Sequence, residues 1–401
     1  MARPGPERRT AVAAVVAVLL LGVCLRAPVT AVGPLIERIG ADTGLGTTAL
    51  GLLGAVPVIG FGIGSALVHR PAVRFGPERV VAVALMVLAA AVVLRSLPVP
   101  GALWVGTAGL GVAIAAGNVL APAVIKREQP HRIALVTACF TAVMTTTGAT
   151  ASGLAVPVSD AWGGGWRLPL AAFAGVVAVV AVLWVVRARN SPPQPGPTTA
   201  AAPGGVRQPV VARMWRSRSA WLVSVFMGLQ SSVFYILVTW LPTVEAELGL
   251  DPRAAGWHLF VYQVVGMVSG LLLTVLMRGR ADLRGLGVGI SLFSVTAMTG
   301  LYLLPGAALL WVALAAVGSG SALVLALSLF GLRTAHPGHT AQLSSMAQTV
   351  GYGIAAGGPL LAGWVGGTAG WELVLVLAGS IAVVQTVVVL GAARPGLILG
   401  R

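Results

Sequence analysis

Two observations on the sequence predict an all-α integral membrane protein with twelve membrane-spanning helices. Of the 401 residues, 57% are hydrophobic and only 9% are charged, whereas a soluble domain carries roughly 25% charged residues. Apolar segments of the roughly 20 residues that cross a bilayer also recur twelve times. We expect these spans at residues 11–35, 48–68, 79–97, 102–125, 133–157, 167–186, 220–242, 256–277, 286–304, 308–332, 341–365 and 372–391.

A segment that cannot form a packed core divides the twelve spans into six and six. Residues 191–205 read SPPQPGPTTAAAPGG and are followed by several arginines, a composition typical of a linker. We therefore expect an N-terminal six-helix bundle at 1–186, a cytoplasmic linker at 187–219 and a C-terminal six-helix bundle at 220–401.

The two halves also echo each other in sequence. The matched positions, about 208 residues apart, are Pro34 with Pro242, Glu37 with Glu245, Gly109 with Gly318 and Gly111 with Gly320. Parallel repeats of this kind are typical of secondary transporters, which bind solute near the midplane between their halves. The repeat predicts two six-helix bundles related by pseudo-two-fold symmetry.

The basic residues indicate how the helices are oriented. The net charge is +15, but with the N-terminus inside, the external loops hold only Arg38, Arg95, Arg167 and Arg253. This asymmetry follows the positive-inside rule, so we expect a multi-pass protein of the plasma membrane with both termini in the cytoplasm. The tryptophans fall near predicted helix ends and are expected to be interfacial anchors. The charge therefore needs no nucleic acid partner, and the expected partners are the lipid bilayer and a small-molecule substrate.

Arg26 is the leading candidate for a substrate-binding residue. It lies inside a run that is otherwise apolar from Thr10 to Gly33. An arginine near the bilayer centre is unfavourable by roughly 2.5 to 3.5 kcal/mol on insertion scales, so it normally faces a protein interior or an aqueous cavity. Pro28 cannot donate to the carbonyl of Cys24, which predicts a local break in the helix. The alternative is an arginine that only binds a neighbouring backbone carbonyl.

Neutral polar residues deep in other spans are further candidates. The expected substrate-binding set is Arg26, Asn118, Tyr235, Gln263, Gln348 and Tyr352. Neutral donors together with one cation suit a small anion or a polarised solute, although each of these residues can instead serve interhelical packing. Glu37 and Glu245, at the outer edge, are the acids nearest to a pathway and the candidates for ion coupling. Because every Asp and Glu falls in a loop or near a helix end, whereas proton-driven carriers commonly place an ionisable group within the membrane, a uniporter or anion exchanger fits at least as well as a proton symporter unless one of these two acids titrates.

Four sequence blocks resemble one branch of the major facilitator superfamily, the cyanate and 2-nitroimidazole transporter family. The blocks are LRAPVTAVGPL at residues 25–35, NVLAPAVIKREQP at 118–130, FYILVTWLPT at 234–243 and LSSMAQTVGYGIAAGGPLLAG at 343–363. The family usually has Asn-Leu-Arg where this chain has Cys24-Leu25-Arg26. The resemblance implies the twelve-helix major facilitator fold and a carrier of cyanate-like anions or small heteroaromatic compounds.

Basic residues at the cytoplasmic helix ends are candidates for gating contacts. Lys126, Arg127 and Arg333 can each complement a helix C-terminus or pair with a facing loop. The turn that contains RFGPER, with Arg74 and Gly76, resembles the superfamily's basic turn between helices 2 and 3, but it lacks the usual aspartate.

Other functions stay open as alternatives. A proton-linked exporter of drugs or other small organic compounds is the nearest, although helix 5 lacks a Gly-Pro-x-x-Gly-Gly element. A non-transporting membrane sensor is the alternative of another class. HExxH, GxSxG and P-loop patterns are absent, so we do not expect an enzyme. Cys24 and Cys139 indicate no disulfide or metal framework, and we expect no cofactor and a monomer.

Overall fold

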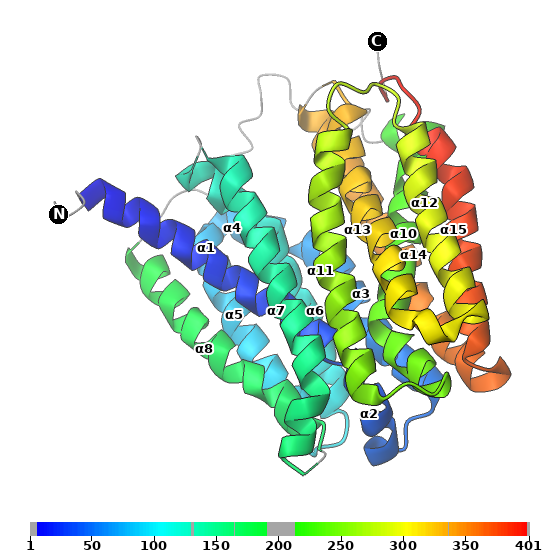
Figure 1. Cartoon of the computed structure of the whole chain (residues 1–401). Coiled ribbons are helices and arrows are strands. Elements are labelled where there is room, and N and C mark those ends of the chain that lie inside the picture. The colour runs from blue at the N-terminus through cyan, green and yellow to red at the C-terminus, as the bar shows by residue number, and fades with distance from the viewer. Residues whose placement is uncertain (1–5, 130–131, 164, 191–212, 336, 399–401) are drawn as a thin grey trace, which may run out of the picture. The chain divides into compact units, whose positions relative to one another are not determined.

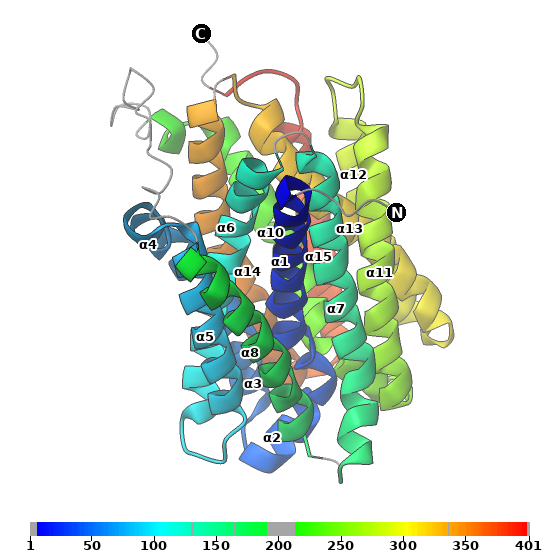
Figure 2. The ribbon, with the colours of Figure 1, turned by 90° about the vertical axis from the view of Figure 1, so that its left-hand side faces the viewer.

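The computed structural model describes residues 6–129, 132–163, 165–190, 213–335 and 337–398. Within these residues the long helices are α1 (Pro6–Thr30), α3 (Thr47–Leu67), α5 (Pro77–Arg95), α6 (Ala102–Glu128), α7 (Ile133–Ala161), α8 (Arg167–Asn190), α10 (Arg218–Glu247), α11 (Pro252–Leu276), α12 (Arg284–Leu303), α13 (Ala308–Leu332), α14 (Pro337–Ala369) and α15 (Glu372–Ala392), shown in Figures 1 and 2. Shorter elements are η1 (Gly33–Leu35), α2 (Ile36–Thr43), α4 (His69–Phe75) and η2 (Pro305–Ala307). The predicted twelve-helix, all-α chain is confirmed, and ten of the described segments are long and apolar enough to cross a membrane.

Local sequence signals set where several helices begin. Asp251 caps α11, because its carboxylate accepts from the Arg253 amide at 3.3 Å, and Pro252 occupies the first helical position, where its missing N–H costs nothing. Ser217 caps α10 in the same way. Before α5, Gly76 has φ of 85°, a backbone conformation that favours glycine, and Pro77 then starts the helix.

The contacts group the described residues into two compact units. The first unit holds the residues up to Val32 and those from Gly60 to Asn190, and the second holds residues 33–59 together with those from Arg213 onward. Sequence order alone assigned residues 33–59 to the N-terminal bundle, but their contacts join them to the second unit. The bundle boundaries at 186 and 220 stay a prediction, and linker residues 191–212 lie outside the described part of the chain.

Corresponding helices pair in the same way in both units. In the first unit α1 packs against α7, while α5 packs against α6 and α8; in the second, α10 packs against α14, while α12 packs against α13 and α15. The glycine matches have a physical basis. A Cβ atom on Gly60 would lie 2.9 Å from the Gly111 Cα, and one on Gly320 would lie 2.0 Å from the Gly266 carbonyl oxygen. Both contacts bring helix backbones together as GxxxG-type packing does in membranes.

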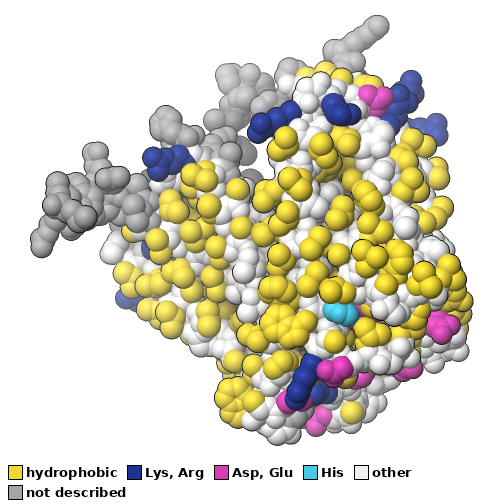
Figure 3. All heavy atoms as spheres, in the orientation of Figure 1, with side chains coloured by type: hydrophobic (Ala, Val, Ile, Leu, Met, Phe, Trp, Pro, Cys, Tyr) yellow, Lys and Arg dark blue, Asp and Glu magenta, His cyan; other side chains and the backbone are white. Residues whose placement is uncertain are grey.

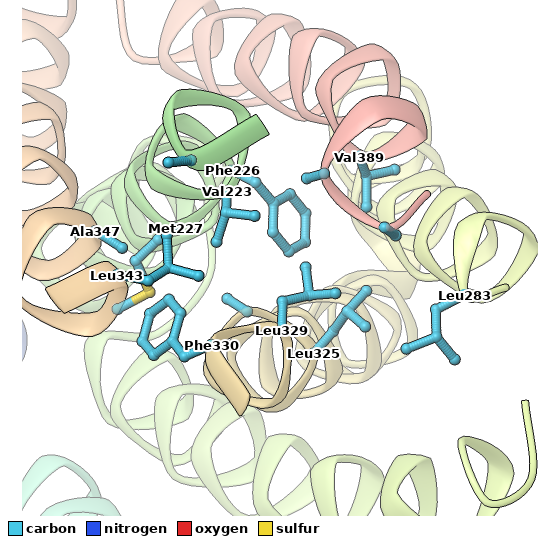
Figure 4. Close-up of a cluster of buried hydrophobic side chains, with 14 of the residues drawn as sticks. Val223, Phe226, Met227, Leu283, Leu325, Leu329, Phe330, Leu343, Ala347 and Val389 are labelled. Carbon is cyan, nitrogen blue, oxygen red and sulfur yellow. The ribbon is translucent and has the colours of Figure 1, made fainter. Parts of the chain in front are cut away.

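A large part of the second unit's hydrophobic core lies at the end where α10 begins. Val223, Phe226 and Met227 of α10 meet Leu325 and Leu329 of α13, with α14 and α15 completing the cluster (Figure 4). Each of these side chains is buried, which contributes about 1.5 to 3 kcal/mol for a residue of this size in water. In a bilayer the corresponding gain comes from close packing.

The outward faces of the helices suit lipid. Large hydrophobic side chains such as Val179, Leu272, Leu310 and Val387 are exposed. Figure 3 shows a face on which hydrophobic side chains cover the middle of the helices, while Lys, Arg, Asp and Glu gather toward the helix ends.

The prediction that the tryptophans are interfacial anchors is wrong for several of them. Trp166, Trp184 and Trp240 are buried. Trp184 Nε1 donates to the carbonyl of Ala17 at 3.1 Å and ties α8 to α1. Proximity to a helix end does not distinguish a tryptophan that faces lipid from one that faces a neighbouring helix.

Candidate substrate-binding site

The end of α1, which carries Arg26, is fixed by hydrogen bonds with α7 of the first unit. Thr30 Oγ1 donates to the carbonyl of Gly148 in α7 at 2.7 Å, and Ser152 Oγ donates to the carbonyl of Thr30 at 3.1 Å. The helix continues through Pro28 and ends at Thr30, so the predicted break beside Arg26 is wrong. Arg26 itself is partly buried and makes interactions within the protein.

Arg95 is a further candidate functional residue, one that its sequence context did not single out. Its side chain is 1% exposed, and Nη1 donates to the carbonyl of Pro28 at 2.7 Å. Among the described residues, its Nε and Nη2 atoms have no hydrogen-bond partner. The assignment of Arg95 to an external loop is therefore wrong. The signal was available, because position 95 lies inside the predicted span 79–97.

The chain makes room for Arg95 through a glycine. A Cβ atom on Gly106 of α6 would lie 2.5 Å from the Arg95 amide nitrogen, so α5 and α6 approach each other closely here. The Pro28 carbonyl is one of the last four of α1, which lack intrahelical partners. Arg95 supplies the missing donor two residues after Arg26.

Arg26 and Asn118 lie next to a shared contact within the first unit. A Cβ atom on Gly117 would lie 2.6 Å from Leu25 Cδ2, so α6 meets α1 at the residues that precede Asn118 and Arg26. Asn118 is exposed.

Tyr235 and Tyr352 come together in the second unit. Both pack against a small buried cluster made by Ala55 and Val58 of α3 with Ala355 and Ala356 of α14. The aromatic set continues from Tyr235 to Phe234, edge to face at 5.1 Å between centroids, and from Phe234 to Tyr262, stacked at 6.0 Å. Aromatic faces of this kind can stack on a planar solute.

The two glutamines differ in their surroundings. Gln348 Nε2 donates to Ser344 Oγ at 2.8 Å, one turn earlier on α14, and its side chain is only partly buried. Gln263 is 3% exposed, and its Nε2 donates to the carbonyl of Leu259 at 3.4 Å. Gln348 shares a helix face with Tyr352 because the two residues are four positions apart. Gln263 lies in the interior, next to Tyr262 in the chain.

Residues 33–59 pack against α10 and α14 through backbone contacts. Pro242 cannot donate to the carbonyl of Val238. Gly33 packs directly against this carbonyl, since a Cβ atom added to Gly33 would lie 2.1 Å from its oxygen. The carbonyl of Pro359 accepts from Trp240 Nε1 at 2.9 Å. Trp240 also contacts Trp371, with 4.7 Å between ring centroids. Trp240 therefore has a structural role in the second unit.

The predicted gating residues fall into two groups of contacts. In the first unit Arg127 pairs with Glu78 of the RFGPER turn and with Glu128, which also pairs with Arg187. Burial opposes the charge on Arg127, but the bonds to Glu78 and Glu128 prevail and raise its pKa. These pairs join the start of α5 to the ends of α6 and α8.

The remaining gating candidates take no part in those ion pairs. Arg74 is exposed and lies over the Phe75 ring at 5.1 Å, while Gly76 forms the turn before α5 and the Lys126 side chain lies outside the described part of the structure. In the second unit Arg333 Nη1 donates to the carbonyls of Ala392, at 3.1 Å, and Arg394. Arg333 thereby caps the end of α15, and burial lowers its pKa.

The two candidate coupling acids have different environments. Glu37, on α2, is exposed and lies beside Thr243 of α10. Glu245 has no exposed surface, and its Oε1 lies 2.9 Å from His258 Nδ1. Among the described residues no group of His, Cys, Asp and Glu side chains could hold a metal ion.

The sequence from α1 to α14 matches the model of the Major Facilitator Superfamily over residues 18–358. This chain belongs to the Major Facilitator Superfamily. It is a multi-pass membrane transporter with a small-molecule substrate, in keeping with its family.

Relatives within the superfamily cover most of the chain. It is 34% identical over 346 residues to the 2-nitroimidazole transporter of Escherichia coli (strain K12), which covers 86% of each chain. It is 32% identical over 382 residues to the uncharacterized transporter YycB of Bacillus subtilis (strain 168), covering 94% of this chain and 92% of that one. The cyanate transport protein CynX of Escherichia coli (strain K12) is 27% identical over 356 residues, covering 86% and 88%. The resemblance stated from the sequence is confirmed.

Solved structures confirm the fold. The crystal structure of a D-xylose-proton symporter superposes with a TM-score of 0.73 at 17% identity, covering 95% of this chain and 96% of that one. An inward-facing bacterial homologue of the lysosomal transporter Spinster gives 0.72 at 16% identity, covering 98% of each. At these identities the likeness shows the major facilitator fold alone.

Proposed function

We propose that this transporter carries small solutes, either cyanate-like anions or small heteroaromatic compounds, by alternating access. The observation that carries the proposal is the match to the 2-nitroimidazole transporter over 86% of both chains. The match to the cyanate transport protein extends the class to a small anion. Both solutes are small and polarised, so a cation together with neutral donors suits either.

The proposed binding groups are Arg26 and Asn118 in the first unit and Tyr235, Tyr352, Gln348 and Gln263 in the second. Arg26 supplies the positive charge, which favours an anion or the negative end of a polarised group. Tyr235 and Tyr352 supply aromatic faces next to the same buried cluster. The proposed gating residues, which would hold the ends of helices, are Arg127, Lys126, Arg74, Gly76 and Arg333. The contacts of Arg127 and Arg333 with neighbouring helix ends support this role for these two residues.

The proposed setting is the plasma membrane, with both termini in the cytoplasm and the protein acting as a monomer without catalytic activity. The excess of basic residues in the expected internal segments supports this orientation. Cysteine labelling at positions 190 and 250 from either side of sealed cells would test it.

Flux measurements test the proposed function. Proteoliposomes that contain the purified protein are expected to take up labelled cyanate or a labelled 2-nitroimidazole and to exchange it for unlabelled solute inside. Liposomes without protein are the control for passive permeation, which matters because small neutral compounds cross bilayers unaided. Equal flux in both preparations, for both solutes, would rule out this substrate class.

The buried contact between Arg95 and Pro28 yields a separable prediction. Burying a guanidinium with two unpartnered nitrogens costs several kcal/mol, and apolar replacements of buried charged groups are often neutral or stabilising. We therefore expect Arg95→Met to keep or raise thermal stability in detergent. The Pro28 carbonyl loses its donor, however, so the α1 end moves and the apparent KM for solute is expected to rise about tenfold, the effect of roughly 1.4 kcal/mol.

Arg189→Met is the matched control, because Arg189 is exposed on α8. An unchanged KM in Arg95→Met would show that Arg95 does not position α1 for binding. A large loss of stability would show instead that Arg95 serves folding.

A further inference from the structure

Glu245 is a fully buried carboxylic acid near the end of α10. Its side chain has no exposed surface, Oε1 lies 2.9 Å from His258 Nδ1 of α11, and Oε2 has no hydrogen-bond partner among the described residues. The His258 side chain is 14% exposed. The pair therefore reaches from the interior of the second unit to its surface.

Because the Glu245 carboxylate is buried, its protonation state strongly affects the energy of this pair. An ionised carboxylate in the interior is unfavourable unless it is paired and hydrogen-bonded. His258 satisfies one oxygen and leaves the other without a donor. The carboxylate can gain a proton on Oε2 and become a neutral acid, and His258 can hold a second proton. Two groups this close titrate as a pair.

Other charged groups lie on the elements that pack against the end of α10. They are Glu37, Arg38 and Asp42 on α2, Glu247 on α10, Asp251 and Arg253 at the start of α11, and Glu372 at the start of α15. Neither η1 nor α13 carries a titratable residue. On α14, His339 lies in the first turn of the helix, twenty residues before Pro359, which contacts Trp240 of α10. The described hydrogen bond of the Glu245 carboxylate is made with His258.

We propose that the Glu245–His258 pair binds and releases the proton that moves with the transported solute. The proposal rests on the proposed function, because it assigns the ion of that same transport cycle. Hydronium transfers one proton to Glu245 Oε2 and leaves as water, and the reverse step returns it. Protonation removes the negative charge that holds His258⁺, so the contact between α10 and α11 weakens. Deprotonation restores it.

The test compares two kinds of flux in proteoliposomes. One is accumulation of labelled cyanate or 2-nitroimidazole driven by a pH gradient, and the other is exchange of labelled for unlabelled solute at equal pH. Glu245→Gln is expected to lose gradient-driven accumulation at least tenfold and to keep exchange. Glu247→Gln is the matched control, because Glu247 is exposed two residues along the same helix. Wild-type accumulation by Glu245→Gln would overturn the proposal.

A measurement without solute keeps the proposal independent of the substrate class. Infrared difference spectra between acidic and alkaline pH contain bands from every carboxyl group that titrates, so the readout is the component that Glu245 contributes. This component is expected in the wild type and in Glu247→Gln, is expected to be lost in Glu245→Gln, and should shift its pH midpoint in His258→Asn. A Glu245→Gln spectrum identical to that of the wild type overturns the assignment, even if Glu245→Gln no longer transports. Exchange by the wild type without gradient-driven accumulation would refute the proton site alone, whereas no flux of either solute would refute the proposed function.

Discussion

Replacing Arg26 by alanine is expected to abolish solute transport while the protein still inserts and folds. A hydrogen bond to a charged group contributes about 1.5 to 3 kcal/mol, so its loss lowers affinity roughly 10- to 150-fold at 1.4 kcal/mol for each factor of ten. The α1 end is held by Thr30, Ser152 and Arg95 through backbone carbonyls, and none of these bonds uses the Arg26 side chain. Folding should therefore survive the substitution.

The measurement is initial uptake in proteoliposomes at matched protein content, with size-exclusion chromatography in detergent as the check on folding. If charge alone matters, Arg26→Lys is expected to retain part of the activity. Lysine keeps the positive charge but lacks the planar fork of arginine. Arg189→Ala, an exposed arginine of α8, should transport normally. Normal uptake by folded Arg26→Ala would show that this arginine only binds neighbouring backbone.

Replacing Gly320 by leucine is expected to prevent the second unit from folding. A Cβ atom there would lie 2.0 Å from the carbonyl oxygen of Gly266 and 2.5 Å from its Cα, so the clash is with backbone and no side chain can move aside. Overpacking a closely packed site costs typically 1 to 3 kcal/mol and occasionally more. The whole contact between α11 and α13 must separate to accept the new side chain.

Gly331→Leu provides the matched control on the same helix. A Cβ atom at Gly331 would meet nothing within 4 Å, and the position is exposed. Leucine is a better helix former than glycine and suits lipid, so this variant should be at least as stable as the wild type. The measurement is the yield of monodisperse protein and its thermal transition in detergent. Equal yields for the two variants would mean that α11 and α13 are not held at this distance.

The side chains that face the interior of each unit could be predicted only in part from the sequence. Arg26 stood out because a charge in an apolar run is recognisable from its neighbours alone. Arg95 did not, because whether a residue at the end of a span faces lipid, water or another helix depends on which helix lies beside it. Trp240 was misassigned for the same reason, since its partners Pro359 and Trp371 are more than a hundred residues away.

The all-helical class, the twelve long helices and the family could be predicted from the residues alone, because bilayer thickness sets the length of an apolar segment and because the family motifs are local runs of residues. Packing between helices, which no local pattern reveals, brings Gly60 to Gly111 as it brings Gly266 to Gly320, and places Tyr235 and Tyr352 against one cluster. It also buries Glu245 against His258. The physical reason is that hydropathy reports how apolar a segment is, whereas close packing between helices selects which side chain faces which partner.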